Sequence, residues 1–240
     1  QQFLDTIRWA REAGFVNLNA DVIFGIPGQT LDEWLETLEK TAACGITHLS
    51  AYSLKIEEGT VFYSWKRSGR LREMEDEKER ELYHKGIALL HQLGLEQYEI
   101  SNFARKGFAC RHNLTYWRNG EYIGCGCGAH SHLHSIRCGN VKDIGTYIDR
   151  MNNGRPAIDF KEEIDSQTEL FETLMLGFRL KEGIRKKDFL DRYGFSLRNR
   201  YPKELEMLGA KGLIEEDAEA FRPTALGLDF ENTIALAFLK

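Results

Sequence analysis

Strand-like and helix-like segments alternate along the N-terminal part of the chain, and this alternation limits the possible folds more than any other feature. Apolar residues at helical spacing predict helices, and short β-rich runs predict strands. The predicted segments are strands over 17–24, 47–54 and 97–100, and helices over 31–43 and 73–93. This order is typical of a parallel sheet with right-handed crossovers, so we expect an α/β fold.

A further helical pattern precedes the first predicted strand. Residues 3–13 place apolar side chains at helical spacing, and Gly14 follows as a stop signal. Because the pattern opens on a helix, we expect an incomplete barrel that lacks its first strands. The strand over 17–24 would then expose an edge and favour self-association. The next helix has a clear start, with Thr30 at the N-cap and Glu33 at the capping-box position.

Unusual segments follow each predicted strand, at 25–30, 53–59 and 101–105. Barrels and open α/β sheets bind ligands at the carboxyl ends of their strands. The sequence therefore predicts a site at this end of the sheet. We expect Asp21 and Lys55 to lie near the carboxyl ends of two adjacent parallel strands.

The most distinctive segment is the run 112–117, which holds His112, Asn113, Tyr116 and Trp117. Its neighbours are a polar stretch upstream and a glycine-rich stretch downstream. Segments of this kind carry ligands more readily than they fill a core. Imidazole and phenolate are also side chains that reach heme iron. The alternative is an aromatic loop on the barrel rim with a structural histidine.

The five cysteines are odd in number and lack the spacing of a secreted disulfide scaffold, which favours a reducing, cytosolic compartment. Cys125 and Cys127 form a C-x-C pair, and His130, His132 and His134 follow at alternate positions. Alternation along a strand would place the histidines on one face, which could form a zinc or other soft-metal site. The other interpretation is a glycine-rich strand end without a metal. Both stay open.

Composition narrows the possible partners. The 240 residues are 42% hydrophobic and 29% charged, with a net charge of −5. These values are typical of a globular protein, and the acidic balance argues against a nucleic-acid groove. The sequence shows no apolar run of membrane-spanning length and no signal-peptide pattern at its start.

The pattern changes after Pro156. Helices are predicted over 165–180, 185–193, 197–208 and 224–239, and a strand pair over 212–216 and 219–223. Helices with a two-stranded wing predict a small winged-helix-like α+β domain. The wing carries Glu215, Glu216, Asp217 and Glu219, which would repel a phosphate backbone. We therefore predict a packing or lid domain over 154–240, after a barrel domain over 1–153.

Four segments together resemble one known family: 19–30, 98–104, 112–117 and 128–131. They are similar to the HemW-type heme chaperones, which are radical S-adenosylmethionine (SAM) proteins related to the oxygen-independent coproporphyrinogen III oxidases. The resemblance covers essentially the whole chain. It implies the C-terminal part of an incomplete (β/α) radical SAM barrel, N-terminally truncated, followed by a HemN-type C-terminal domain.

The resemblance also implies cofactors. The family holds SAM and a four-iron four-sulfur cluster, the latter through a C-x-x-x-C-x-x-C motif. No such spacing occurs here, so we expect no metal ligands and no cluster in this fragment. Asp21, Lys55 and His130 match positions that contact SAM. His112, Asn113 and Tyr116 match the heme-binding motif of the chaperone branch. No catalytic residue is assigned.

The implied function is to bind heme in the cytoplasm and to transfer it to acceptor proteins, membrane-associated ones among them. The alternative within the same superfamily is a coproporphyrinogen III oxidase, which decarboxylates a porphyrinogen. A third interpretation, from a different class, is a zinc protein built on Cys125, Cys127 and the histidines.

Overall fold

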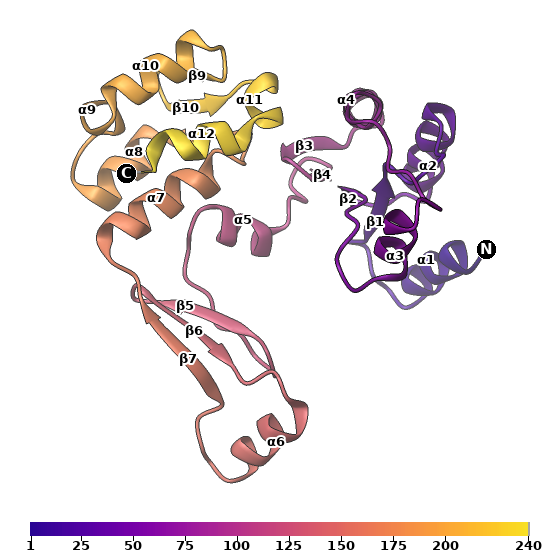
Figure 1. Cartoon of the computed structure of the whole chain (residues 1–240), viewed down its shortest axis with the longest axis horizontal. Coiled ribbons are helices and arrows are strands. Elements are labelled where there is room, and N and C mark those ends of the chain that lie inside the picture. The colour runs from indigo at the N-terminus through magenta and orange to yellow at the C-terminus, as the bar shows by residue number, and fades with distance from the viewer. Residues whose placement is uncertain (240) are drawn as a thin grey trace. The chain divides into compact units, whose positions relative to one another are not determined.

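The computed structural model describes residues 1–239. The chain divides into two compact units, of which the first is Gln1–Cys110 and the second begins at Arg111. Figure 1 shows their elements along the chain. The domain boundary predicted after residue 153 falls within the second unit. Each unit is described by itself below.

The first unit contains the predicted parallel strand pair. Strand β1 (Asn19–Phe24) pairs in parallel with β2 (His48–Ser53), and helix α2 (Leu31–Ala43) connects them. The start of α2 is the predicted capping box. The Thr30 hydroxyl accepts a hydrogen bond from the Glu33 backbone N–H at 3.3 Å, and the Glu33 carboxylate accepts one from the Thr30 N–H at 2.9 Å.

The third predicted strand takes a different place from the one expected. Strand β3 (Glu96–Glu99) does not pair with β2, because β4 (Asn102–Ala104) lies between them and is antiparallel to both. The expectation of a wholly parallel sheet, with 101–105 as a strand-end loop, was therefore wrong. The cause is burial: all three residues of β4 are buried, and Phe103 is only 1% exposed.

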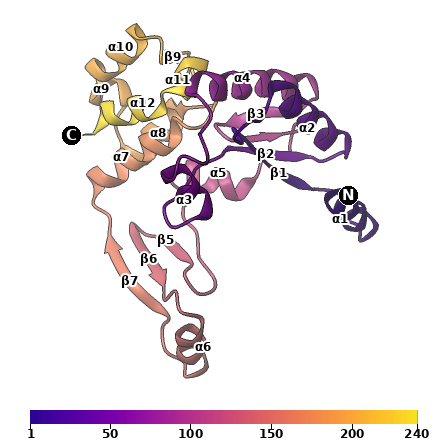
Figure 2. The same cartoon turned by 45° about the vertical axis from the view of Figure 1, so that its right-hand side comes forward.

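The core of the first unit lies between the sheet and two helices. Helices α2 and α4 (Asp76–Gln92) contact each other, and Figure 2 shows both over the sheet. Trp34 is fully buried there and donates its indole N–H to the Leu82 carbonyl at 3.0 Å. Gly86 makes this approach possible, since a Cβ at that position would lie 2.7 Å from Trp34 Nε1. Two further helices are α1 (Gln2–Glu12), as predicted, and α3 (Val61–Arg67), which was not predicted.

Strand β1 forms the outer edge of its sheet, and this leads to a prediction. Unpaired strand edges recruit other strands, so we expect the 240-residue chain to associate in solution. Light scattering across a concentration series measures the mass. Ile23→Lys, which places a charge on an exposed position of β1, should reduce association. A monomer at all concentrations, with a cooperative melt, would count against the prediction.

The second unit begins with α5 (Arg111–Trp117), followed by an antiparallel sheet. Its strands are β5 (His130–Leu133), β6 (Ile136–Asn140) and β7 (Ile158–Glu163), in that order. Helix α6 (Ile144–Asn152) connects β6 to β7. Strand β7 thus pairs with β6 in the same sheet as β5, the strand that holds His130 and His132.

The rest of the second unit has the predicted helices and wing. Its helices are α7 (Ser166–Gly177), α8 (Lys186–Tyr193), α9 (Leu197–Arg200), α10 (Pro202–Ala210), α11 (Ala225–Asp229) and α12 (Glu231–Phe238). The wing pairs β9 (Ile214–Glu216) with β10 (Ala220–Pro223), and β8 (Ile184–Arg185) extends it. The helix predicted over 197–208 is broken at Tyr201–Pro202, because proline fits only the first turn of a helix. The helix predicted over 224–239 is likewise broken, at Phe230.

A second core holds these elements together. Its fully buried members include Leu174 and Phe178 next to Phe221 and Phe238. The charge of the acidic wing is offset in part, since Glu216 pairs with Arg198 and Lys186. Within residues 1–239, no helix combines the length and the apolar character needed to cross a membrane.

Candidate functional site

A polar face of the first sheet carries Asp21. Ala20 and Phe24 of β1 are buried in the core, whereas Asn19 and Asp21 are exposed. Asp21 is the third of the six residues of β1, so it lies mid-strand and not at the strand end that we expected. Its carboxylate accepts a hydrogen bond from Asn19 Nδ2 at 2.6 Å. The remaining oxygen lone pairs are those that a ribose hydroxyl or an ammonium group would need.

His48 supports this polar face. Its Nδ1 lies 2.6 Å from Asn19 Oδ1, and its Nε2 lies 2.9 Å from the Tyr98 hydroxyl. Because the amide oxygen only accepts, Nδ1 donates and Nε2 accepts from Tyr98. Burial lowers the pKa of His48, and the nearby Asp21 carboxylate opposes this in part. A neutral imidazole therefore fixes Asn19 next to Asp21.

This arrangement predicts a dependence of stability on pH. The pKa of His48 lies below its ordinary value of 6.5 in the folded state, so the unfolded chain binds its proton more readily. The contribution of His48 to stability is present above pH 6.5 and falls as the pH drops from there to the folded-state pKa. Denaturant titrations at pH 7.5 and 5.5 measure the loss. His48→Asn should show a smaller loss, and an equal loss would contradict this account.

Lys55 lies two residues beyond β2 and is exposed. Polar groups in the segments that follow β1 and β2 already have hydrogen-bond partners within the protein. The Gly25 backbone N–H donates to Gln29 Oε1 at 2.9 Å, and the Ser53 hydroxyl donates to Glu79 Oε1 at 2.6 Å. No contact joins Lys55 to Asp21 among the described residues. The third residue matched to SAM, His130, belongs to the second unit.

The distinctive segment 112–117 forms α5, and its aromatic residues begin a row of rings in the second unit. His112 and Tyr116 lie one turn apart, with ring centroids 4.7 Å apart in an edge-to-face arrangement. The Tyr116 ring contacts that of Tyr122 at 4.5 Å, and Tyr122 lies 6.2 Å from His132. The row thus runs from α5 to β5.

A cavity of about 400 Å³ opens beside these rings. Its volume falls within the range of small-molecule and cofactor sites. Of the predicted heme residues, Asn113 and Tyr116 line it, whereas His112 is exposed, is not part of the lining, and contacts the Tyr116 ring. The remaining lining residues are Trp117, Asn119, Gly120, Tyr122, His132, Arg137, Glu172, Met175 and Leu176.

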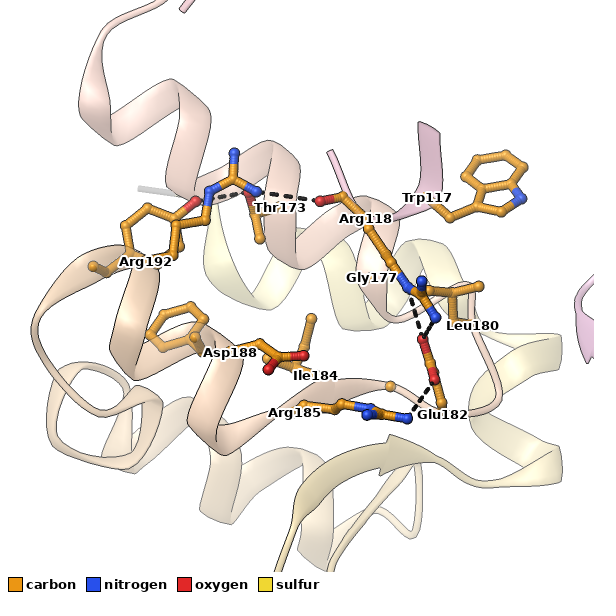
Figure 3. A pocket seen from close by; sticks show the side chains of 13 residues that line it. Trp117, Arg118, Thr173, Gly177, Leu180, Glu182, Ile184, Arg185, Asp188 and Arg192 are labelled. Atoms are coloured by element: carbon orange, nitrogen blue, oxygen red, sulfur yellow. Dashed lines mark hydrogen bonds and ion pairs between the residues drawn. The ribbon is translucent and has the colours of Figure 1, made fainter. Parts of the chain in front are cut away.

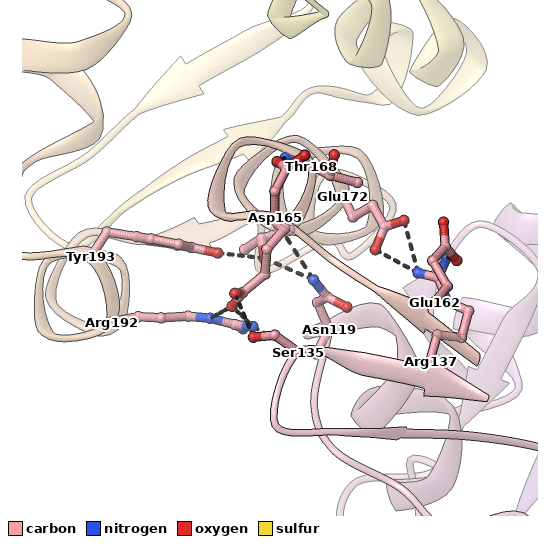
Figure 4. Close-up of polar contacts among 11 residues, drawn as sticks. Asn119, Ser135, Arg137, Glu162, Asp165, Thr168, Glu172, Arg192 and Tyr193 are labelled. Atoms are coloured by element: carbon pink, nitrogen blue, oxygen red, sulfur yellow. Dashed lines mark hydrogen bonds and ion pairs between the residues drawn. The ribbon is translucent and has the colours of Figure 1, made fainter.

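Helix α7 supplies one part of the cavity and anchors the sheet (Figure 4). Arg137 of β6 donates to both carboxylate oxygens of Glu172, at 2.8 and 2.7 Å, and also contacts Glu162 of β7. Asn119 donates to the Thr173 hydroxyl at 3.1 Å. Burial raises the pKa of Tyr122, and the neighbouring Tyr116 adds to the shift. At neutral pH the Tyr122 phenol is therefore protonated.

Sequence reasoning missed Tyr122, Arg137 and Glu172 as cavity residues. They come from a loop, a strand and a helix, and no local motif joins them. His132 carried a signal, since alternation along β5 places it on the same face as His130. That signal suggested a metal site and not a cavity wall.

A second hollow lies near the start of α8, and Trp117 forms part of its wall (Figure 3). Its arginines are used in internal ion pairs. Arg118 and Arg185 both pair with Glu182, and Arg192 pairs with Glu169. The Arg118–Glu182 pair joins the end of α5 to the segment before β8, and the Arg192–Glu169 pair joins α8 to α7. The hollow is therefore better explained as a structural contact between these elements than as an anion site.

The geometry does not support the zinc interpretation. Within residues 1–239, no group of three or more His, Cys, Asp or Glu side chains could hold a metal ion. Cys125 and Cys127 are exposed free thiols. His134 lies in the turn after β5 with a φ of +51°, away from the alternation of the strand. The same cysteines also do not fit an iron–sulfur cluster.

Comparison with known proteins gives one family match, several similar curated proteins and one similar solved structure. Residues 164–230 match the HemN C-terminal domain family. The chain is 39% identical over 231 residues to the heme chaperone HemW of Bacillus subtilis, a match that covers 96% of this chain and 61% of that protein. It is 30% identical over 238 residues to HemW of Lactococcus lactis, covering 99% and 62%. The structure of coproporphyrinogen III oxidase (HemN) from Escherichia coli, a radical SAM enzyme, matches with a TM-score of 0.74 at 17% identity, covering 98% of this chain and 58% of that one.

The fold is therefore an α/β fold that matches part of the HemN structure, as the sequence predicted. In sequence, the chain is similar to the HemW heme chaperones over almost its whole length. It spans 61% and 62% of the length of these two relatives.

Proposed function

We propose that this chain is the heme-handling part of a HemW-type heme chaperone, which binds heme and passes it to acceptor proteins in the cytoplasm. The observation that carries the proposal is the cavity of the second unit, where Tyr116 and Asn113 of the motif segment line a space walled by aromatic rings. The names of the HemW relatives support it.

Each motif residue has a physical role in this proposal. Tyr116 presents a ring to the porphyrin plane and a phenolic oxygen that can reach iron. His112 packs edge-on against that ring at the rim, which restricts its orientation. Asn113 contributes an amide that can hydrogen-bond a polar group of the ligand. Tyr122 and Trp117 extend the aromatic wall.

A titration with hemin and with iron-free protoporphyrin tests the proposal. Ligation by this chain should give a saturable change of the Soret band at about one equivalent, and tighter binding of hemin than of the iron-free ring. Equal affinity for the two would favour a pocket that only shapes a porphyrin, as in the oxidase interpretation. No saturable binding of either would refute a heme site in this chain. Mixing the heme-loaded chain with an apo-hemoprotein then tests transfer.

We further propose that Asp21 contacts SAM, a role that the family resemblance also implies for Lys55 and, separately, for His130. The exposed Asp21 carboxylate beside Asn19 supports this role, and SAM supplies the radical chemistry of the superfamily when it is bound. Calorimetry with SAM tests it, because Asp21→Asn should weaken binding while the melting temperature stays unchanged. Unaltered binding would exclude Asp21.

A further inference from the structure

The motif histidine, His112, is not the imidazole that faces the cavity. That position belongs to His132, whose side chain lines the space although the residue is only 5% exposed. His132 reaches the cavity because its backbone is fixed on both sides. Its N–H and C=O form two hydrogen bonds of 2.9 Å with Tyr122, and on its other side it is in register with Arg137.

This register aligns four side chains in one row across the sheet. Residues directly opposite in antiparallel strands share a face, so Tyr122, His132, Arg137 and Glu162 follow one another on a single face. Both neighbours of His132 in the row have partners of their own: Tyr122 contacts the Tyr116 ring, and Arg137 is paired with Glu172 and Glu162. His132 is the member between them.

The ring nitrogens of His132 form no hydrogen bond to any residue within 1–239, and its imidazole lies against the ring of Tyr122. Buried imidazoles normally satisfy their nitrogens with a partner. An imidazole that lines an aromatic cavity and keeps a nitrogen available has the chemistry of a heme-iron ligand. The adjacent Met175 and Leu176 provide apolar contact of the kind a porphyrin face requires.

We infer that His132 is a heme-binding residue of this chain, and that its imidazole ligates the iron of a heme held in the cavity. The inference rests on the proposed heme function and extends it to a residue outside the motif segment. His112 and His132 then act at different places: His112 holds the Tyr116 ring at the rim, and His132 meets the metal inside.

Hemin titrations of the 240-residue chain test the inference, with His132→Ala compared against the unchanged protein. The variant should raise the Kd for hemin by about tenfold or more and shift the Soret band, since an iron ligand is lost. Added imidazole should restore part of the original spectrum by filling the vacated position. Affinity for iron-free protoporphyrin should stay within about twofold, because no metal is ligated there.

Two further variants keep the test decisive. His134→Asn replaces the exposed histidine of the next turn with a residue that tolerates its positive φ, and it should leave the spectrum unchanged. His132→Gln keeps volume and polarity and serves where the alanine variant does not fold. If the unchanged chain binds hemin and a folded His132 variant keeps the same Soret band, the inference about His132 is overturned and the proposed heme function is not. Absence of hemin binding by the unchanged chain would overturn the proposed function with it.

Discussion

Alanine at Gly124 should destabilise the second unit and weaken heme binding at the same time. A Cβ at this position would lie 2.1 Å from the backbone oxygen of His130 and 2.9 Å from its nitrogen. Backbone atoms cannot swing aside as a flexible side chain can, so the loop must move away from β5. We expect a loss of about 3 kcal/mol in the free energy of unfolding. The Tyr122–His132 backbone pair lies next to this contact, so the cavity wall should shift as well.

Gly145 provides the matched control. It lies in α6 of the same unit, and its nearest neighbour to an added Cβ is Asp143 Oδ1 at an ordinary 3.5 Å. Gly145→Ala should leave hemin binding unchanged and raise stability by up to about 1 kcal/mol, because alanine favours helix. Denaturant unfolding and hemin titration measure both variants. Equal stability of the two variants would show that the close approach at Gly124 does not constrain the cavity.

The second large effect concerns the motif segment itself. Tyr116→Ala removes a ring that contacts His112 at 4.7 Å and Tyr122 at 4.5 Å, and it removes a phenol from the cavity. An aromatic contact with the porphyrin would contribute about 0.5–1.5 kcal/mol, so its loss alone should raise the Kd for hemin by roughly twofold to tenfold. His112→Ala should have a smaller effect in the same direction and alter the Soret band, because it acts through the Tyr116 ring.

Asp21→Ala is the comparison for this series. Asp21 lies on β1 of the first unit, so its removal should change neither the Soret band nor the Kd for hemin. One hemin titration followed at the Soret band ranks Tyr116→Ala, His112→Ala and Asp21→Ala by their Kd for hemin. Spectra identical to the unchanged protein in His112→Ala, Tyr116→Ala and the double variant would remove the motif segment from heme binding. The oxidase interpretation would then be preferred.

Local signals in the sequence predicted local structure well. The capping box at Thr30 and Glu33 formed as expected, because both of its hydrogen bonds lie within one turn of a helix. The parallel pair β1 and β2 followed from the strand–helix–strand order. The wing of β9 and β10 followed from two short β-rich runs separated by a turn.

The features that the sequence could not predict depend on contacts between distant residues. Strand β4 looks polar and irregular, yet its pairing with both β2 and β3 buries Phe103. The cavity is a stronger case, since the Arg137–Glu172 pair joins a strand to a helix. His112 is the opposite case, because it carried a sequence signal but does not line the cavity. Its residue type indicated heme chemistry, but its place on α5 leaves it exposed at the rim.

The central claim is that heme binds in the cavity of the second unit, and the position of the iron in a crystal of the heme-loaded chain tests it most directly. Anomalous scattering at the iron edge locates the metal without reliance on a model of the porphyrin. We predict one iron peak in the cavity, within ligand distance of His132 and near the Tyr116 ring. An iron peak at the exposed thiols of Cys125 and Cys127, with an empty cavity, would contradict the claim.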